Sequence, residues 1–322
     1  MRDPSAIVGN STGWAPFTCE RWRAERVREV SGLAQHPYLP AGDRPELVPP
    51  SFLSAQYVDA FALGVPDAPA RLNGGNACRW LAEVRVGDAL ERTSTVVDAE
   101  VKSGRTGRLE LYTIETVYRR AGSGAEVATL RYTAIRRYPA ATEGPPAAAT
   151  ADGSRPATGA RPSGGELPAG AVRVFSTTVA SRDVVRYAVA TEDLYEAHYD
   201  EPYARASGLP GTIVHGLLKM AWLARGALEY AGTGSVLREL SASYRGMDLV
   251  RESFTVWVEP EPAGGAADGT RLRLYGQSQG GAVSTVGAAV LDRASSPPPP
   301  VAVRADPGGA GTQTRFQRQV EE

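Results

Sequence analysis

The sequence predicts an α+β protein made of two successive copies of one unit, in which a curved antiparallel sheet encloses a long helix. The 322-residue chain contains two blocks of roughly 120 residues. Each block runs in the same order, from helical segments into several strand-like runs, which indicates a tandem duplication. Hydrophobic residues make up 42% of the chain, which is enough for two cores.

Composition sets the block boundaries. Residues 139–171 consist mainly of Pro, Gly, Ala, Ser and Thr, so we expect a disordered linker there. Residues 294–322 begin with a proline-rich run and lack periodicity, which predicts a flexible tail. The folded domains are therefore predicted at 14–138 and 172–293.

The first block shows helical periodicity over 18–31 and again over the apolar segment 51–63, which predicts two helices. Turn residues then separate runs of alternating β-branched and aromatic residues, a pattern typical of strands. These predicted strands cover 79–88, 90–104, 107–122 and 125–138.

The second block repeats this order. It is predicted to contain an opening strand at 172–180, a helix across 191–204 and a long apolar helix over 212–230. The strands that follow are long enough to wrap around a helix that is apolar on most sides, and this is the hotdog architecture. The chain is thus predicted to be a double hotdog, with the last strands at 236–246, 251–260, 270–279 and 282–292.

Charge and cysteine usage exclude several functions. The net charge is −1 without blocks of like charge, so we expect no nucleic-acid partner. No stretch approaches the roughly 18 apolar residues that span a bilayer, so we expect no membrane partner. Cys19 and Cys78 lack metal-ligand spacing and a secretory leader, which favours a reducing, cytoplasmic location.

One stretch holds two of the three histidines and a carboxylate. Asp193 precedes His198 by five residues, and His215-Gly216 then opens the apolar helix. A carboxylate and an imidazole that converge on one water molecule can add it to an activated double bond. The alternative is structural, with Asp193 capping a helix and His198 buried in the core.

This stretch resembles the MaoC-like hydratases and dehydratases. Their signature reads approximately Ser-Gly-Asp-x-Asn-Pro-Ile-His, followed by Gly-Leu-Pro and Ile-x-His-Gly. The corresponding residues here are 191–198, 208–210 and 213–216, and the likeness covers most of 175–290.

The resemblance implies a role for three residues. Asp193 and His198 hold the water, and the backbone amide of Gly216 polarises the thioester carbonyl. Amides at a helix N-terminus stabilise the developing enolate charge without reorganising, and glycine permits close approach. His215 is expected to be structural.

Three neighbours of the pair depart from the signature. Glu192 replaces the family glycine, Tyr195 the asparagine and Glu196 the proline. A phenol beside the water narrows the pocket or adds a hydrogen-bond donor, so Tyr195 is a candidate for substrate binding. An added carboxylate raises the pKa of a neighbouring acid.

The first block resembles the degenerate N-terminal domain of two-hotdog members, through residues 48–52, 72–75 and 86–88. Aligned on the signature, Leu33 takes the place of the Asp and Tyr38 that of the His. This block is therefore expected to be catalytically silent and to contribute packing and part of the acyl tunnel.

Two other sequence features are interpreted as structural rather than functional. Gly276–Gly280 matches the G-x-S-x-G pattern of hydrolases, but strand-like residues follow it, so we interpret it as a hairpin. Arg131, Arg136 and Arg137 are interpreted as a solvated sheet edge, with contact to carrier phosphates as the alternative.

The function implied is a carbon–oxygen lyase reaction, the interconversion of 2-enoyl and (R)-3-hydroxyacyl thioesters in fatty acid or polyketide metabolism. Coenzyme A or an acyl carrier protein would carry the acyl group, without another cofactor and without metal. Two hotdogs in one chain mimic the dimer of single ones, so a monomer or homodimer is expected. A hotdog thioesterase and a non-catalytic thioester-binding or scaffolding subunit are the alternatives.

Overall fold

The computed structural model describes most of both blocks. Most of the predicted linker, the tail over 294–322, and His36 and Tyr38 lie outside the described residues. No helix in the described part is long and apolar enough to span a membrane. The described residues are 3–33, 47–104, 107–139, 166–232, 234–261 and 269–292.

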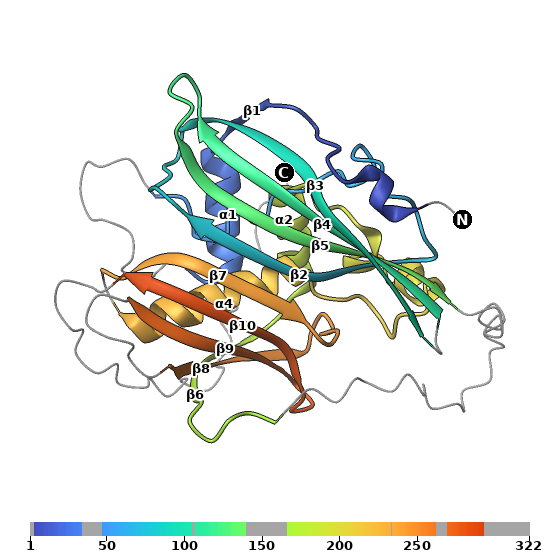
Figure 1. Cartoon of the computed structure of the whole chain (residues 1–322). Helices are drawn as coiled ribbons and strands as arrows, with labels where there is room; N and C mark the ends of the chain where they lie inside the picture. Colours follow the sequence, from blue (N-terminus) through green and yellow to red (C-terminus); the bar gives the residue numbers. More distant parts are fainter. Residues whose placement is uncertain are drawn as a thin grey trace, which may run out of the picture.

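All strands of the described part form one antiparallel sheet, in the order β1-β3-β4-β5-β2-β7-β10-β9-β8-β6 (Figure 1). The first block supplies one half of this sheet and the second block the other, as the double hotdog predicts. The strands are β1 (Ala15–Thr18), β2 (Ala70–Trp80), β3 (Ala89–Gly104), β4 (Gly107–Arg120), β5 (Glu126–Pro139), β6 (Val172–Thr178), β7 (Val236–Tyr244), β8 (Ser253–Pro260), β9 (Thr270–Ser278) and β10 (Val283–Asp292).

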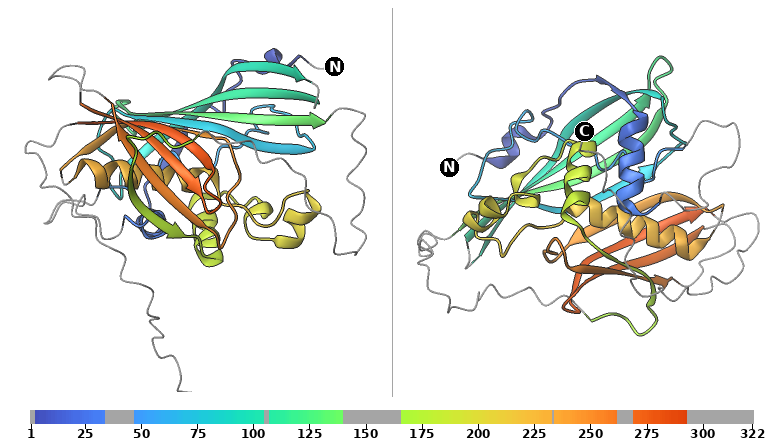
Figure 2. Two further views of the ribbon diagram at one scale, coloured as in Figure 1. Left: turned by 90° about the horizontal axis from the view of Figure 1, so that it is seen from below. Right: turned by 180° about the vertical axis from the view of Figure 1, so that it is seen from behind.

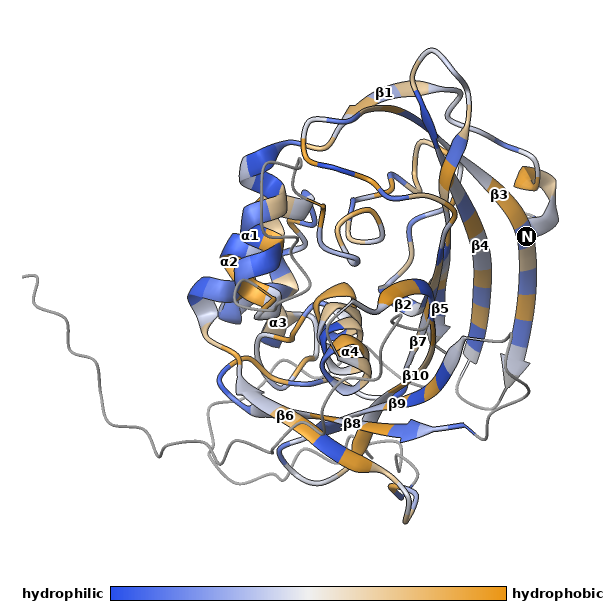
Figure 3. Ribbon diagram, turned by 90° about the vertical axis from the view of Figure 1, so that its left-hand side faces the viewer, coloured by the Kyte–Doolittle hydropathy of each residue, from blue (hydrophilic) through white to orange (hydrophobic). Residues whose placement is uncertain are grey.

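The halves meet where β2 pairs with β7, from Gly75 opposite Ser243 to Arg79 opposite Glu239. Across this junction the Tyr244 hydroxyl donates to Asn76 Oδ1 at 3.0 Å. The sheet curves around the helices, and α1 (Arg21–Ser31) and α2 (Ser181–Thr191) cover the open side (Figure 3). These two helices, one from each half, pack side by side (Figure 2).

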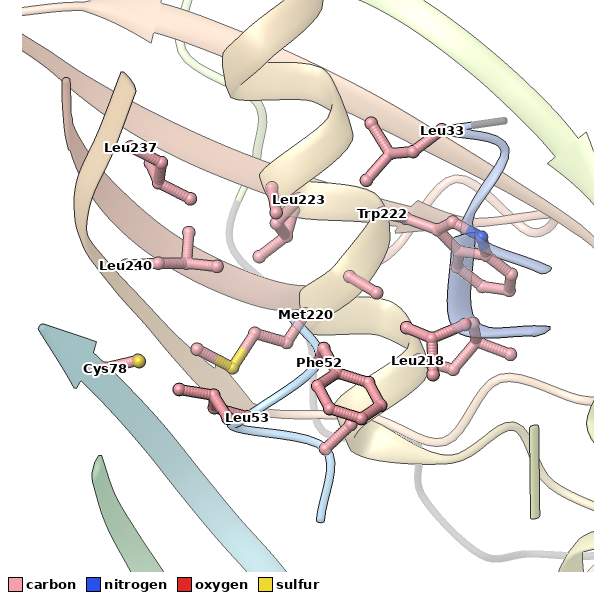
Figure 4. Packing of buried hydrophobic residues seen from close by; sticks show 14 of the residues in the cluster. Leu33, Phe52, Leu53, Cys78, Leu218, Met220, Trp222, Leu223, Leu237 and Leu240 are labelled. Atoms are coloured by element: carbon pink, nitrogen blue, oxygen red, sulfur yellow. The ribbon is translucent and has the colours of Figure 1, made fainter. Parts of the chain in front are cut away.

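The central helix of the second half is α4 (Gly216–Ala231), which confirms the predicted apolar helix and begins four residues later. It packs against β6 to β10 because almost all of its faces are apolar. Figure 4 shows Met220 and Leu223 directed at β7. Trp222 lies on another face, and its indole donates to the Val30 carbonyl at 3.3 Å. The side chains around α4 include Leu33, Phe52, Leu53, Cys78, Leu237 and Leu240.

The predicted helix over 51–63 is wrong. These residues form successive turns, and the described part of the first half has no long central helix. The apolar pattern marked burial instead: Phe52 and Leu53 are fully buried beside α4. The amide of Tyr57 donates to the Thr191 carbonyl of the other half at 3.0 Å, so a long-range partner replaces the next helical hydrogen bond.

Two further boundaries differ. The predicted strand 79–88 is shifted toward the N-terminus, because β2 begins at Ala70 and ends at Trp80. The predicted helix 191–204 is wrong over most of its length, since α2 ends at Thr191. A 3-10 turn η2 (Glu196–His198) and a short α3 (Glu201–Ala206) follow. The other predicted strands agree with the structure within a few residues, and 276–280 lies at the hairpin between β9 and β10.

We predict that Gly75→Ala destabilises the junction more than Gly74→Ala. A Cβ at residue 75 would lie 2.9 Å from the Ala242 carbonyl oxygen, a backbone atom of the paired strand. A Cβ at residue 74 would meet the flexible end of Ile135 at 2.7 Å, which can move. The free energy of unfolding in urea should fall by about 1–3 kcal/mol for Gly75→Ala. An equal or larger fall for Gly74→Ala would contradict this.

Candidate active site

The C-terminal end of α2 sets the direction of the loop that carries Asp193 and His198. Thr191 ends the helix with its hydroxyl bonded to the Tyr187 carbonyl at 2.8 Å. Glu192 then adopts a left-handed conformation with φ of 64°. This conformation costs a non-glycine residue about 1–2 kcal/mol, which accounts for glycine at this place in the signature.

Arg23 of α1 holds this strained turn from the other half of the chain. Its Nε donates to the Ala190 carbonyl at 2.7 Å, and its Nη1 lies 3.4 Å from the Glu192 carboxylate. A second guanidinium nitrogen donates to Gln56. Arg23 is buried, so these bonds to a helix end fix the position from which Asp193 starts.

His198 is buried on η2 with a defined tautomer. Its Nδ1 lies 2.8 Å from the Ile213 carbonyl oxygen, which can only accept, so Nδ1 carries the hydrogen. Nε2 therefore has a free lone pair. Burial lowers the pKa of His198, although the nearby Asp193 carboxylate opposes this shift. The imidazole is neutral at neutral pH and can accept a proton.

The structure brings Asp193 and His198 together, and it adds His215. Each offers one ligand-type atom, and these atoms lie within 4.8 Å of one another. His215 Nε2 lies 3.2 Å from the Asp193 backbone oxygen, and its ring stacks on His198 with centroids 3.6 Å apart. Burial lowers the pKa of His215 well below its ordinary value. We therefore interpret His215 as a neutral residue that positions Asp193.

A carboxylate with two neutral imidazoles is also a donor set for a transition metal. The expectation of chemistry without a metal therefore stays a prediction.

Gly216 is the first residue of α4, so its amide has no acceptor within the helix. A Cβ at this position would lie 3.0 Å from the Tyr244 ring, which explains why the site needs glycine. The amide and the helix dipole together favour a negatively charged oxygen.

Asp193, His198, Gly216 and Tyr195 all line one pocket of about 570 Å³. Both halves of the chain form its wall. Residues of strands β2, β4 and β5 line this cavity directly, since the described part of the first half has no long central helix. The first half contributes, among others, Tyr57, Phe61, Arg71, Asn76, Tyr132 and Arg136.

Tyr195 lies between the first half of the chain and the pair Asp193 and His198, which is called the couple below. Its ring lies edge-on to His198 with centroids 5.8 Å apart, and the Arg71 guanidinium lies 5.0 Å from its centre. Burial raises the pKa of the phenol, which stays neutral. This geometry suits the predicted contact with substrate, which stays a prediction.

Sequence reasoning missed a buried ion pair behind the site. Lys219, one turn after Gly216, donates to Asp248 at 2.8 Å and to the Gly246 carbonyl at 2.9 Å. Asp248 also accepts from Ser278 at 2.6 Å, and its backbone oxygen accepts from Val214. The pair thereby supports the segment whose Ile213 carbonyl orients His198. The available signal was a lysine in the first, apolar half of this helix.

Comparison with known proteins agrees with this geometry. Residues 167–261 match the family model described as a MaoC like domain. Residues 41–130 match the model of the FAS1-like dehydratase domain region. No curated protein sequence matches the chain.

Solved structures show the same fold across both halves. A MaoC-like dehydratase superposes with a TM-score of 0.70 at 18% identity, over 90% of this chain and 99% of that one. A MaoC-like dehydratase from Phytophthora capsici gives 0.64 at 17%, over 91% and 99%. A conserved hypothetical protein from Mycobacterium tuberculosis, described as a double hotdog, gives 0.61 at 17%, over 88% and 96%.

We predict that Glu192→Gly is more stable than Glu192→Ala. Both variants lose the contact with Arg23, so their difference isolates the backbone strain at φ of 64°. The free energy of unfolding should be about 1 kcal/mol higher for the glycine variant than for the alanine variant. Chemical denaturation measures this, and an alanine variant of equal stability would refute the strain.

We also predict that the His198 imidazole titrates below its ordinary value of 6.5. In Asp193→Asn the pKa should fall further, because the carboxylate that favours the protonated ring is gone. NMR titration of the imidazole signals, assigned with His198→Gln, measures both values. A pKa that rises in Asp193→Asn would contradict the charge interaction.

Proposed function

We propose that this chain, which has a MaoC-like C-terminal domain in a two-domain architecture of the MaoC type, interconverts 2-enoyl and (R)-3-hydroxyacyl thioesters. The observation that carries the proposal is the convergence of Asp193 and His198 beside the Gly216 amide on one pocket. Family membership of the matched domains supports hydratase or dehydratase chemistry at the coarse level. The resemblance of the loop supports the finer reaction.

In hydration, Asp193 and His198 hold one water molecule. The water oxygen adds to C3 of the enoyl group, and the electron pair of the double bond moves through C2 toward the thioester oxygen. The Gly216 amide stabilises that charge. One water proton passes to the couple and one proton returns to C2, so the product differs from substrate by one water molecule.

His198 is suited to this exchange. Its Nδ1 hydrogen is held by the Ile213 carbonyl, which leaves Nε2 to take a proton from water. In dehydration the couple removes the C2 proton and protonates the leaving hydroxyl. The acyl group would be carried by coenzyme A or an acyl carrier protein, with the protein working as a monomer or homodimer.

We predict that Asp193→Asn lowers the hydration rate of 2-butenoyl-CoA by about 10²–10⁴-fold, because the amide lacks the charge that favours protonated His198 once this ring has taken the water proton. The folded state should persist, since Asp193 is only partly buried and contributes little to the core. Loss of the conjugated enoyl absorbance measures the rate, and circular dichroism measures folding.

Asp183→Asn, a carboxylate on the first turn of α2, is the matched control and should leave the rate unchanged. A fully active Asp193→Asn enzyme would refute the role of the couple. Release of free thiol and of the unsaturated acid, without formation of a 3-hydroxyacyl thioester, would instead identify a thioesterase.

A further inference from the structure

Two arginines of the first half enter the pocket side by side. Arg71 on β2 and Arg136 on β5 are directly opposed in the antiparallel register, so their side chains share one face of the sheet. Both line the pocket. Their guanidinium carbons lie 5.7 Å and 5.5 Å from the centre of the Phe61 ring, which places the two cations around one aromatic side chain.

Arg136 is only 3% exposed, so it does not belong to the solvated sheet edge that the sequence suggested. Its Nε donates to the Pro66 carbonyl at 2.7 Å. Among the described residues no carboxylate forms an ion pair with it. Glu110, its neighbour on β4, bonds instead to Arg108 at 2.8 Å and to Tyr112 at 2.7 Å.

Arg71 is also weakly paired. Asp67 approaches it only to 3.9 Å, and that carboxylate is 77% exposed. By contrast, Arg79 further along β2 is exposed, pairs with Glu239 at 3.4 Å and does not line the pocket. A buried guanidinium without a counter-charge is unfavourable, and an anion that enters the pocket would relieve it. Arg71 and Arg136 are therefore available to bind an anion in the pocket.

The phenols beside these arginines strengthen an anion site. Tyr57 and Tyr132 line the same part of the pocket. Burial raises the pKa of both, so they stay neutral and present hydroxyl donors rather than phenolate charges.

We propose that Arg71 and Arg136 bind a carboxylate on the acyl chain of the substrate, which would be the mono-thioester of an unsaturated dicarboxylic acid. The inference rests on the proposed function and deepens it. Guanidinium groups bind carboxylates through paired, charge-assisted hydrogen bonds. The second carboxylate would fix the chain so that C3 faces the couple.

Distance favours the acyl chain over the phosphate of the carrier arm. Arg71 lies 5.0 Å from the Tyr195 ring, which in turn lies 5.8 Å from the His198 ring. An extended chain advances about 1.2 Å per bond, so the phosphate of a pantetheine arm ends about 15 Å from the sulfur. A carboxylate a few bonds beyond the double bond is within reach.

The test uses thioesters of N-acetylcysteamine, which carry no phosphate. The mono-thioester of 2-hexenedioic acid is compared with its neutral 6-carboxamide. The protein should hydrate the acid with a kcat/KM about tenfold or more above that of the amide. Arg71→Met and Arg136→Met should each lower kcat/KM for the acid far more than for the amide and so remove that preference, whereas Arg79→Met, an exposed β2 arginine outside the pocket and the matched control, should leave the preference unchanged.

Equal loss for both substrates, or no preference in the parent protein, overturns the proposal. The proposal also fails if the arginine variants lose activity only with coenzyme A thioesters, whether acid or amide, and not with N-acetylcysteamine thioesters. That result would mean that the arginines bind phosphate. Arg71 is partly exposed, so Arg71→Met keeps the test intact if Arg136→Met fails to fold. Arg136→Lys retains the charge and should restore part of the preference.

A binding measurement separates this inference from the proposed function. The saturated hexanedioic mono-thioester of N-acetylcysteamine is titrated calorimetrically into the parent protein and into Arg71→Met. Binding to the parent alone, without turnover of any enoyl thioester, supports the carboxylate site while the hydratase proposal fails. Equal affinity of both proteins for this ligand overturns the carboxylate site.

Discussion

The pairing of β2 with β7 is the constraint on which the site depends. It joins the two halves into one sheet, so that strands of the first half face a cavity whose reacting groups come from the second. The bond from Tyr244 to Asn76 ties the wall beside Gly216 to the first half at the same place. Separated from its partner, the second half would expose the couple to water, which weakens every electrostatic interaction within it.

The first half also positions the loop that carries Asp193 and His198 from behind. Arg23 binds the end of α2, and the Tyr57 amide binds the Thr191 carbonyl. These contacts explain how Glu192 can hold a conformation that glycine holds in the related signature. The strain of one residue is offset by hydrogen bonds from segments more than a hundred residues away in sequence, so the loop and the first half form one unit.

Much of this fold could be predicted from local patterns. Alternation identified the strands from β3 to β5 and from β7 to β10, and apolar periodicity identified α4, because each pattern reflects burial against the same sheet. The segment after Pro50 is apolar for the same reason but not helical, since its backbone bonds to distant partners. The Gly-rich start of β2 forms a strand because β5 and β7 pair with it on both sides.

The site also combines residues that local sequence patterns indicate with residues that only tertiary contacts bring together. Asp193, His198 and Gly216 are close in sequence to helix ends, so spacing and resemblance pointed to them; the structure places them on one pocket, and their catalytic roles stay a prediction. Lys219 and Asp248 are far apart along the chain, and Arg71 and Arg136 become neighbours only through strand register. Such pairs depend on tertiary contacts that no local pattern contains.

In the proposed reaction, the stacked histidines would allow one imidazole both to take and to return a proton. A charge on His198 lowers the pKa of His215, so the two rings do not become charged together. His215 keeps its Nε2 hydrogen on the Asp193 carbonyl throughout. Burial lowers the pKa of His198 while Asp193 raises it. An imidazole balanced between these opposing effects can accept a proton from water and release it again within one turnover.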